Sequence, residues 1–506
     1  MTSNPFFTAR LENMRAWRVL LLRSVGTRVP WLTPDWHWGG LSGQLGALWV
    51  SWFTWAKFAA HQALCKLYHK PFVSLLIFSF RQKSANSSIV TITKVPVFSL
   101  PDDSAADQTS KLLQHHLSNS PIEPDEAGIP FANPSSDLRF SSFVSLFSPS
   151  DRSYEASLFR LGHALFDDLD LHLGNSITID IRTRIASFRR KAALSAWLQE
   201  AVLLAVEAEL REQPAVGSTA VAFTLLTGNQ VEKACETAMD GGNVKLATLI
   251  SQGAGDSDFQ EDLREQLEIW REQRIDAHID ESIRKIYALL GGVVDVVEGS
   301  KGTGIERCSD IDILKGLDWK RTFGLHLWFS EPLNAPIAQV FQSYCRHWRE
   351  SSRRATPPNP SYHEHLPPAQ MPSRWRPSSI PPLDGLFSLI KLHADPACSL
   401  SQILTPSSFG PSPVDYSLSW HLYILLSRCM RVRDFADRGD PGIDSVMEIN
   451  RDEETRVEGH SPSADLLAST YAFQLEQLGM IQEAVFVLLH IEGSVGCVAL
   501  HTCSGQ

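Results

Sequence analysis

The sequence has few cysteines, no general excess of basic residues and no apolar run long enough to be an obvious membrane span. Its eight cysteines are scattered through 506 residues without a C-x-x-C pair or Cys/His pairs at zinc spacing. We therefore expect neither a disulfide-rich scaffold nor a zinc finger. The formal net charge of −11 argues against a general nucleic-acid binder, because phosphate contacts require a surplus of Lys and Arg. The Trp-rich apolar run at 45–56 is well short of the ~20 residues that a membrane-spanning helix needs.

Sequence motifs of catalysis are missing as well. There is no G-x-S-x-G motif that would present a serine nucleophile. The glycine-rich stretch 291–304 contains Lys301 but does not match the phosphate-binding pattern G-x-x-x-x-G-K-[ST], so we interpret it as a loop between helices. We expect no enzymatic activity, no cofactor and no small-molecule substrate.

Two stretches could bind a metal ion by residue type alone. Acidic residues at 167–170 precede His172, and Asp168 and His172 would share one face if this stretch were helical. A solvated helix face is the simpler interpretation, and we adopt it. His363 and His365 fall in a proline-rich stretch that offers no rigid second pair of ligands. No metal site is predicted.

The residues that are present indicate a folded, mainly helical chain. Hydrophobic residues make up 43% and charged residues 20%, which excludes a wholly disordered protein. Residues 1–80 carry a net charge of +6, whereas 434–458 carry −6. Composition and periodicity divide the chain into six segments: an atypical Trp-rich basic segment (1–80), a β segment with a linker (81–136), a helical stack (137–352), a proline-rich linker (353–385), a continued helical stack with an acidic loop at 434–463 (386–496) and an atypical tail (497–506).

One β-strand is predicted near the N-terminal end, within 84–98. Ile89 and Val95 fall on one face of this alternating segment and Val90 and Ile92 on the other, and Pro96 marks its end. Residues 99–137 are rich in Ser, Asp and Pro, and we interpret them as a loop or linker.

Helical periodicity begins near Asp151, where apolar residues recur at three and four residues from Tyr154 to Leu169. A second helical region covers 177–213. Its apolar residues start with Ile181, Ile185 and Phe188 and become almost continuous from 192 to 208, so we expect this helix to be buried on most sides. Val221–Met239 is predicted to be one helix and Val244–Ser251 the next, whereas 258–290 fits either one long helix or several shorter ones. Helices are expected again at 386–392 and 416–433, and 466–491 is expected to be a closing helix pair.

Small residues recur in two of these helical stretches. Ala234, Ala238, Gly242 and Ala247 correspond in type to a second set, which is Ala468, Ala472, Gly479 and Ala484. Small side chains permit close helix packing, and glycine can end a helix in a left-handed conformation. Eleven large or close-packing residues are predicted to be mostly buried: Leu225, Leu226, Ala234, Ala238, Leu246, Leu249, Tyr287, Leu290, Trp319, Leu325 and Trp328.

Three stretches within 219–330 are specific in combination: TAVAFTLLTGNQVEKACETAMDGGNVKLATLIS, then QLEIWREQRIDAHIDESIRKIYALLGG, then GLDWKRTFGLHLWFS. In this order they resemble the nucleoporin 96 family, and the resemblance extends from about 137 to 496. It implies an all-α fold, an irregular α-helical solenoid of the ancestral coatomer type with a fold-back trunk and crown, and a short N-terminal β segment. It also implies a structural role without catalytic residues, in the outer ring of the nuclear pore complex at the nuclear envelope, supporting transport of mRNA and protein.

The resemblance further implies partners. The family's N-terminal β-blade completes an open β-propeller, the subunit shared with the COPII vesicle coat, and here Ile89, Val90, Ile92 and Val95 would make that contact. The crown would contact other helical nucleoporins of the Y-shaped complex, and no specific nucleic acid is implied. A COPII-like vesicle-coat scaffold of the same fold is the alternative.

Both ends of the chain depart from the family pattern. Within 81–136 only the strand resembles the blade, and residues 1–80 and 497–506 do not continue the pattern. A gene model that translates intron or shifted-frame sequence would account for both ends. Phe-Gly occurs only at Phe323-Gly324 and Phe409-Gly410, so we expect no binding of transport receptors through Phe-Gly repeats.

Overall fold

The computed structural model describes residues 103–124, 128, 130–172, 177–212, 217–253, 256–350, 355–362, 382–438 and 461–491. The Trp-rich segment 1–80, the strand predicted at 84–98 and the tail 497–506 lie outside these residues. Two compact units are present, one within Val97–Leu467 and one that contains Ala468–Ile491. We describe each unit by itself.

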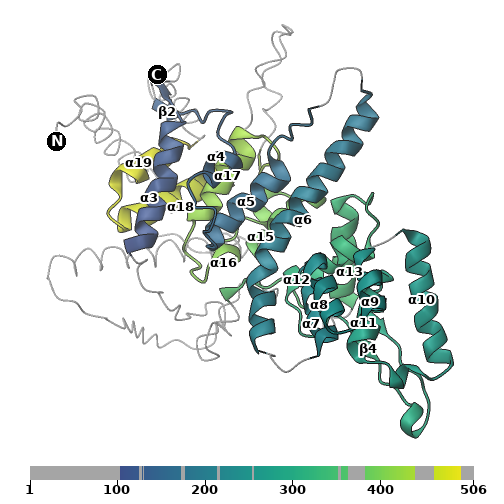
Figure 1. Ribbon diagram of the computed structural model, residues 1–506. Coiled ribbons are helices and arrows are strands. Elements are labelled where there is room, and N and C mark those ends of the chain that lie inside the picture. Colours follow the sequence, from purple (N-terminus) through teal and green to yellow (C-terminus); the bar gives the residue numbers. More distant parts are fainter. Residues whose placement is uncertain are drawn as a thin grey trace, which may run out of the picture. The chain divides into compact units, whose positions relative to one another are not determined.

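The unit within Val97–Leu467 is built almost entirely of helices (Figure 1). This confirms the all-α fold class with a small amount of β structure. Its α-helices are α3 (Asp103–Ser118), α4 (Phe140–Val144), α5 (Tyr154–Phe166), α6 (Ile179–Glu212), α7 (Ser218–Leu226), α8 (Val231–Asp240), α9 (Val244–Ser251), α10 (Ser257–Glu272), α11 (Glu281–Leu290), α12 (Trp319–Leu325), α13 (Ile337–Glu350), α15 (Gly385–Ala394), α16 (Pro406–Phe409) and α17 (Ser417–Tyr423).

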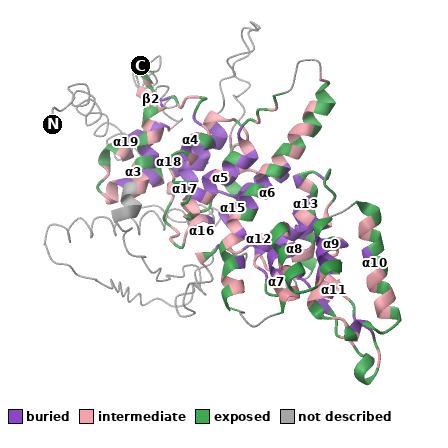
Figure 2. Cartoon of the chain, viewed as in Figure 1, coloured by how far each residue is buried: buried purple, intermediate pink, exposed green. Residues whose placement is uncertain are grey.

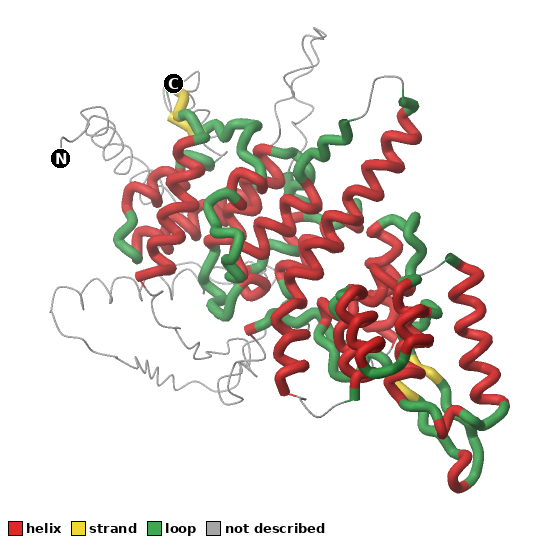
Figure 3. Tube along the Cα trace, viewed as in Figure 1, coloured by secondary structure: helices red, strands yellow, loops and turns green. Residues whose placement is uncertain are grey.

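Short irregular elements connect these helices. Two π-helical segments, His326–Ser330 and Ile424–Cys429, continue α12 and α17 directly. Among the described residues, strands occur only in two small antiparallel hairpins (Figure 3): β1 (Ile122–Pro124) with β2 (Pro130–Ala132), and β3 (Val296–Val297) with β4 (Ile311–Asp312). In register, Ile122 lies opposite Ala132, and Val296 lies opposite Asp312.

The prediction of a loop or linker over 99–137 is wrong for much of that range. The 16-residue helix α3 occupies Asp103–Ser118, and the β1–β2 hairpin follows it. Over 108–118, the part of α3 whose side chains are described, Leu112, Leu113 and His116 are buried. A short apolar stripe in an otherwise polar helix gives a weak periodic signal, so composition alone indicated a linker.

Helix pairs with tight turns make up the region from α7 to α11. The prediction of a single helix over Val221–Met239 is wrong, because α7 ends at Leu226 and α8 begins at Val231. Asn229 adopts a left-handed φ of 54°, and the next amide, on Gln230, donates to the carbonyl of Leu225. This is the hydrogen bond of a Schellman C-cap, which reverses the chain within a few residues. Gly242 ends α8 in the same way, with φ 77°.

The stretch 258–290, for which two interpretations were open, forms two helices. α10 ends at Glu272, a 3₁₀ turn follows at Asp276–His278, and α11 begins at Glu281. Gly292, with φ 76°, then ends α11 and leads into the β3–β4 hairpin. The glycine-rich stretch is therefore a loop between helices, as predicted.

The hydrophobic core lies where these helices cross, and Figure 2 shows buried residues concentrated along their facing sides. The prediction of a mostly buried set is confirmed: eight of the eleven residues are buried, and Leu249, Tyr287 and Trp328 are partly buried against the same core. Residues 355–360 have no helix or strand, as predicted for the proline-rich linker. Residues 434–438 of the predicted acidic loop also have no helix or strand, but both predicted loops end too late, because α15 begins at Gly385 and α18 at Pro462. Residues 363–381 and 439–460, most of the two predicted loops, lie outside the described residues.

Helix α6 is less buried than its composition predicts. Leu204 is 55% exposed and Ala205 is also exposed, so the expectation of burial on most sides is wrong. α5, α7 and α12 are the helices that pack most against the 34 residues of α6. A helix this long, about 51 Å at 1.5 Å per residue, extends beyond such short neighbours and keeps one side in solvent.

The unit that contains Ala468–Ile491 begins inside α18 (Pro462–Gln477) and continues through α19 (Ile481–Leu488). Gly479 takes a left-handed φ of 80°, and the amide of Met480 donates to the carbonyl of Leu475. This reproduces the turn at Gly242, so the similarity in small residues reflects the same helix-ending motif. The predicted closing helix pair is confirmed.

Candidate functional site

The side chains predicted to bind a partner, Ile89, Val90, Ile92 and Val95, lie outside the described residues, and their role stays a prediction. The stretches on which the family resemblance rests are described in full. Residues from the first and third of them meet in one cluster of buried polar side chains inside the unit within Val97–Leu467, and Trp319 of the third stretch belongs to a second cluster.

The first cluster surrounds Arg321, a charged side chain of α12 that is only 3% exposed. Arg321 Nε donates to Thr227 Oγ1 at 2.9 Å, and Nη1 donates to Glu209 Oε2 at 2.5 Å. The Thr224 hydroxyl donates to the other oxygen of Glu209 at 2.9 Å, and the Thr227 hydroxyl donates to the Thr224 carbonyl at 2.6 Å. The ion pair therefore has both of its carboxylate oxygens occupied, which a buried charge requires. It joins α6, the end of α7 and α12.

The second cluster surrounds Asp384, which precedes α15 and is completely buried. Its Oδ1 accepts from Tyr154 Oη at 2.9 Å and from the amide of Leu386 at 2.9 Å, and its Oδ2 accepts from Trp319 Nε1 at 3.2 Å. Burial raises the pKa of the Asp384 carboxyl, while Lys320 and these hydrogen bonds act in the opposite direction. The cluster fixes α5, α12 and the first turn of α15 to one another.

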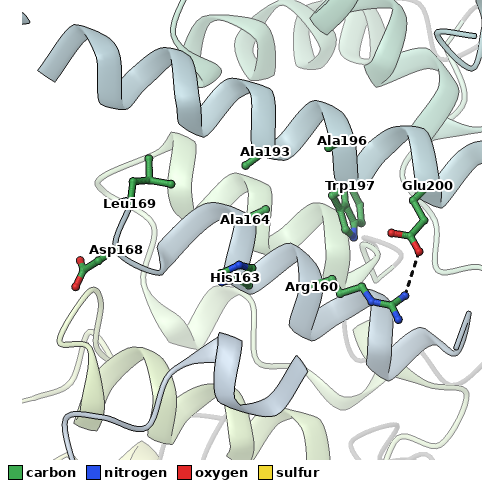
Figure 4. A pocket seen from close by; sticks show the side chains of 9 residues that line it. All are labelled: Arg160, His163, Ala164, Asp168, Leu169, Ala193, Ala196, Trp197 and Glu200. Carbon is green, nitrogen blue, oxygen red and sulfur yellow. Dashed lines mark hydrogen bonds and ion pairs between the residues drawn. The ribbon is translucent and has the colours of Figure 1, made fainter. Parts of the chain in front are cut away.

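A groove of about 330 Å³ lies between α5 and α6 (Figure 4). Arg160 crosses it to Glu200 at 3.3 Å, and it also donates to the carbonyls of Ser148 and Asp151 at 2.8 and 2.7 Å and, more weakly, to that of Pro149 at 3.4 Å. Glu200 is also paired with Arg152. The lining residues are Arg160, His163, Ala164, Asp168, Leu169, Ala193, Ala196, Trp197 and Glu200. No nucleophile with an adjacent base lines the groove, so it offers no catalytic arrangement.

The acidic stretch after α5 does not form the solvated helix face that was predicted. α5 ends at Phe166, and Asp167 is only 3% exposed. Its carboxylate accepts from the amides of Phe140 and Ser141 at the start of α4, and it pairs with His163 Nδ1 at 2.9 Å. Asp167 therefore caps a helix far away in the sequence. Asp168 pairs with Arg139 instead of sharing a helix face with His172.

The described residues do not contain a group of three or more His, Cys, Asp or Glu side chains placed to hold a metal ion. Burial raises the pKa of Cys345 to about 11 and that of Cys429 to about 12. Both thiols are therefore protonated at neutral pH and poorly nucleophilic. His363 and His365 lie outside the described residues. Of the helices in the described ranges, none combines the length and apolarity that crossing a membrane requires.

An exposed apolar pair flanks the turn between α8 and α9, with Met239 in the last turn of α8 and Val244 at the start of α9. Met239 is 58% exposed and Val244 is 63% exposed, and the left-handed Gly242 stands between them. Buried Ala234, Ala238 and Leu246 anchor the two helices beneath the turn. Two exposed apolar side chains on either side of a tight turn are suited to contact an apolar surface of another protein.

The family model described as nuclear protein 96 (Nup96) matches residues 220–496, more than half of the chain. The chain belongs to the Nup96 family. The matched region begins in α7 and contains both the α8–α9 turn and the buried residues Thr227, Arg321 and Asp384.

Similar proteins occur in fungi and plants. Nucleoporin nup189 of Schizosaccharomyces pombe is 30% identical over 393 residues, which cover 76% of this chain and 20% of that protein. The nuclear pore complex protein NUP96 of Arabidopsis thaliana is 29% identical over 245 residues, which cover 48% of this chain and 21% of that protein. Nucleoporin NUP145 of Chaetomium thermophilum is 40% identical over 127 residues, which cover 24% of this chain and 7% of that protein. The chain thus spans about a fifth of the length of the first two Nup96 relatives.

The sequence contained some of the signals for these buried clusters. Thr227 and Arg321 belong to the LLTG and LDWKR motifs, but nothing local indicates that residues 94 positions apart are hydrogen-bonded. Asp384 stands directly before an apolar run, which is the pattern of a helix N-cap. That signal could have located the start of α15 in this Nup96 chain, although not the bonds to Tyr154 and Trp319.

Proposed function

We propose that the chain is a structural scaffold subunit of the nuclear pore complex, located at the nuclear envelope, that supports the transport of mRNA and protein into and out of the nucleus. The observation that carries this proposal is the Nup96 match over 220–496, which includes the helix pairs of the region from α7 to α11 and the pair α18–α19. Helical stacks present extended surfaces to other proteins and commonly serve as scaffolds.

The buried polar groups support a structural role over an enzymatic one. Arg321, Asp384 and Asp167 each have their hydrogen-bonding capacity used in joining helices. Groups held in this way are not available to transfer protons to a substrate. The relatives in S. pombe, A. thaliana and C. thermophilum are all named as nucleoporins or nuclear pore proteins, which favours the pore over the vesicle coat.

Two kinds of partner follow from the proposal. The exposed pair Met239 and Val244 would contact another helical nucleoporin, because both side chains are exposed beside a tight turn within the Nup96 match. Ile89, Val90, Ile92 and Val95 would add a strand to the β-propeller subunit that is shared with the COPII coat. No small-molecule substrate and no specific nucleic acid is proposed.

Affinity purification of the tagged full chain from its source cells tests the proposal. We expect other nuclear pore proteins to co-purify, and we expect Met239→Glu with Val244→Glu to reduce recovery of a helical nucleoporin at least about tenfold, as for apolar anchors of an interface. The matched control, Ser187→Glu with Gln199→Glu, places the same charges at exposed positions of α6 and should leave recovery unchanged. Co-purification with vesicle-coat subunits in place of nucleoporins would contradict the proposal.

A further inference from the structure

The N-terminal half of α6 is an amphipathic helix whose apolar side faces solvent. Ile181 is 52% exposed, and Ile185 and Phe188 are partly exposed. In Figure 2 this end of α6 carries exposed and intermediate residues, whereas buried residues appear farther along the helix, and in Figure 3 it extends past the end of α5. The helical contacts described above and the proposed function leave this surface unexplained.

The exposed apolar residues form a narrow seam on the helix surface. Ile181, Ile185, Phe188 and Ala192 follow one another at spacings of four, three and four residues, the spacing of core positions in a coiled coil. At about 100° per residue the first three fall within an arc of about 60°. Leu194, Trp197 and Leu198 are buried against the rest of the protein. The first two point about 120° away from the nearer edge of that arc, and Leu198 points about 80° away. Over Ile181, Ile185 and Phe188 the seam is therefore separate from the packed side of α6, whereas Lys191, next to Ala192, is buried.

Basic side chains flank the seam on both sides. Arg184 and Arg189 are exposed and occupy the positions that border the core of a coiled coil. The Arg184 guanidinium lies 5.7 Å from the centre of the Phe188 ring, so its charge stands directly beside the seam. Residues 179–191 contain five basic residues and one acidic residue, although the whole chain carries a net charge of −11. Two copies of this surface would repel each other.

We propose that the N-terminal half of α6 is a docking site for an amphipathic helix of a partner protein, with apolar residues along its seam and Glu or Asp on both sides of it. Flanking charges select the partner in helix–helix pairing, and basic residues on both sides select an acidic one. A helix that lies on an anionic membrane has a wider apolar face, of about 100° or more. The narrow seam of α6 favours a helix over a membrane surface.

A binding measurement with the full chain tests this inference independently of the proposed function. The probe is a fluorescent 21-residue synthetic helix with Leu at the core positions and Glu at the flanking positions. A matched peptide with Lys at the flanking positions serves as the reference. Fluorescence anisotropy should show the acidic peptide binding at least about tenfold more tightly than the basic one, because oppositely charged flanks attract and like charges repel.

Charge reversal makes the test specific to the seam. Arg184→Glu with Arg189→Glu should invert the preference in favour of the basic peptide. The control Thr183→Glu with Ser187→Glu adds charge at exposed positions opposite the seam and should keep the acidic preference. Circular dichroism of each variant verifies that α6 stays folded. Equal binding of both peptides, or a preference that survives the reversal, would overturn the inference. So would Arg-dependent binding to phosphatidylserine vesicles without any peptide preference, which would indicate a membrane surface instead.

Discussion

Two buried aspartates each cap the start of a helix in this protein, but their surroundings differ. Asp384 caps α15 and accepts hydrogen bonds only from neutral groups, the Tyr154 hydroxyl, the Trp319 indole and a backbone amide. Burial raises its pKa. Asp167 caps α4 from a distant part of the chain and is also paired with His163. Burial acts to raise its pKa too, but the hydrogen bonds from His163 and Ser141 outweigh burial and the net pKa is lowered.

The comparison shows that a capping position does not by itself decide how a buried carboxylate contributes to the stability of the fold. Neutral donors orient the Asp384 carboxylate but compensate its lost hydration incompletely. A partner that can be cationic, together with two amides at a helix start, stabilises the charged form of Asp167. Asp384 therefore contributes mainly by fixing three helices in place, and Asp167 contributes additional electrostatic stability. The following predictions would sharpen or break this distinction.

The largest effect is expected from Asp384→Ala. It removes the acceptor for Leu386 N and Trp319 Nε1 inside a fully buried site, and together the lost cap and the unpaired indole should cost about 3 kcal/mol of unfolding free energy. Asp384→Asn keeps one acceptor oxygen and should cost about half as much. Urea denaturation, with hydrogen exchange of the α15 amides, measures both variants. An unchanged urea midpoint for Asp384→Ala would show that this cluster does not hold α15.

A smaller loss is expected from Asp167→Ala, about 1–2 kcal/mol, because it removes one helix cap and a pair with a half-exposed histidine. Hydrogen exchange should be faster at the α4 amides and unchanged at α15. The critical result is which of the two alanine variants loses more unfolding free energy. If Asp167→Ala were the more damaging substitution, electrostatic pairing would outweigh burial, contrary to our interpretation.

Acid should affect the two sites in opposite directions. The raised pKa of Asp384 means that its burial cost is present above the folded-state pKa and is relieved as the pH falls through it. The lowered pKa of Asp167 means that its contribution is present above the unfolded value, about 3.9, and is lost as the pH falls through the folded-state pKa. The loss of unfolding free energy caused by Asp384→Asn should therefore increase as the pH falls from 7 to 4. The loss caused by Asp167→Asn should begin to decrease near pH 4. If the unfolding free energy lost by the two Asn variants changed with pH in the same way, the two aspartates would not differ as we infer.

The smallest effect is expected from His163→Gln. The hydrogen bond with Asp167 raises the pKa of His163, so its contribution is complete below the unfolded value of about 6.5 and is lost as the pH rises through the folded-state pKa. The wild-type chain should lose a little stability between pH 6 and pH 8 that the Gln variant does not lose. Thermal unfolding at both pH values measures the difference. His278→Gln, a substitution outside this cluster, is the matched control. If it abolished the loss of stability between pH 6 and pH 8 to the same extent, that loss would not arise from the His163–Asp167 pair.

Local sequence patterns predicted the parts of the fold that depend on neighbouring residues. The spacing of apolar residues located α5, α15 and α17, and Gly242 and Gly479 end their helices as their residue type suggested. Patterns failed where the decisive contact is distant. The short buried stripe of α3 gave too little signal, and the break at Asn229 lay inside a continuous helical pattern.

Local sequence patterns could not predict the buried clusters either, because their hydrogen bonds join residues that are distant in the sequence. Asp167 looked like a solvent-exposed residue until α4, 26 residues away, supplied the amides that it accepts from. Arg321 and Thr227 belonged to motifs that indicated the family, but their pairing depends on how α7 and α12 pack. Ile89, Val90, Ile92 and Val95 lie outside the described residues, so their binding to the propeller stays a prediction.

Imaging of a fluorescently tagged full chain in its source cells tests the central claim most directly. A nuclear pore scaffold should give a continuous rim of signal at the nuclear envelope that coincides with a pore marker, and Met239→Glu with Val244→Glu should weaken that rim while Ser187→Glu with Gln199→Glu does not. Signal confined to cytoplasmic vesicle sites, or spread evenly through the cell for the unaltered chain, would contradict the assignment.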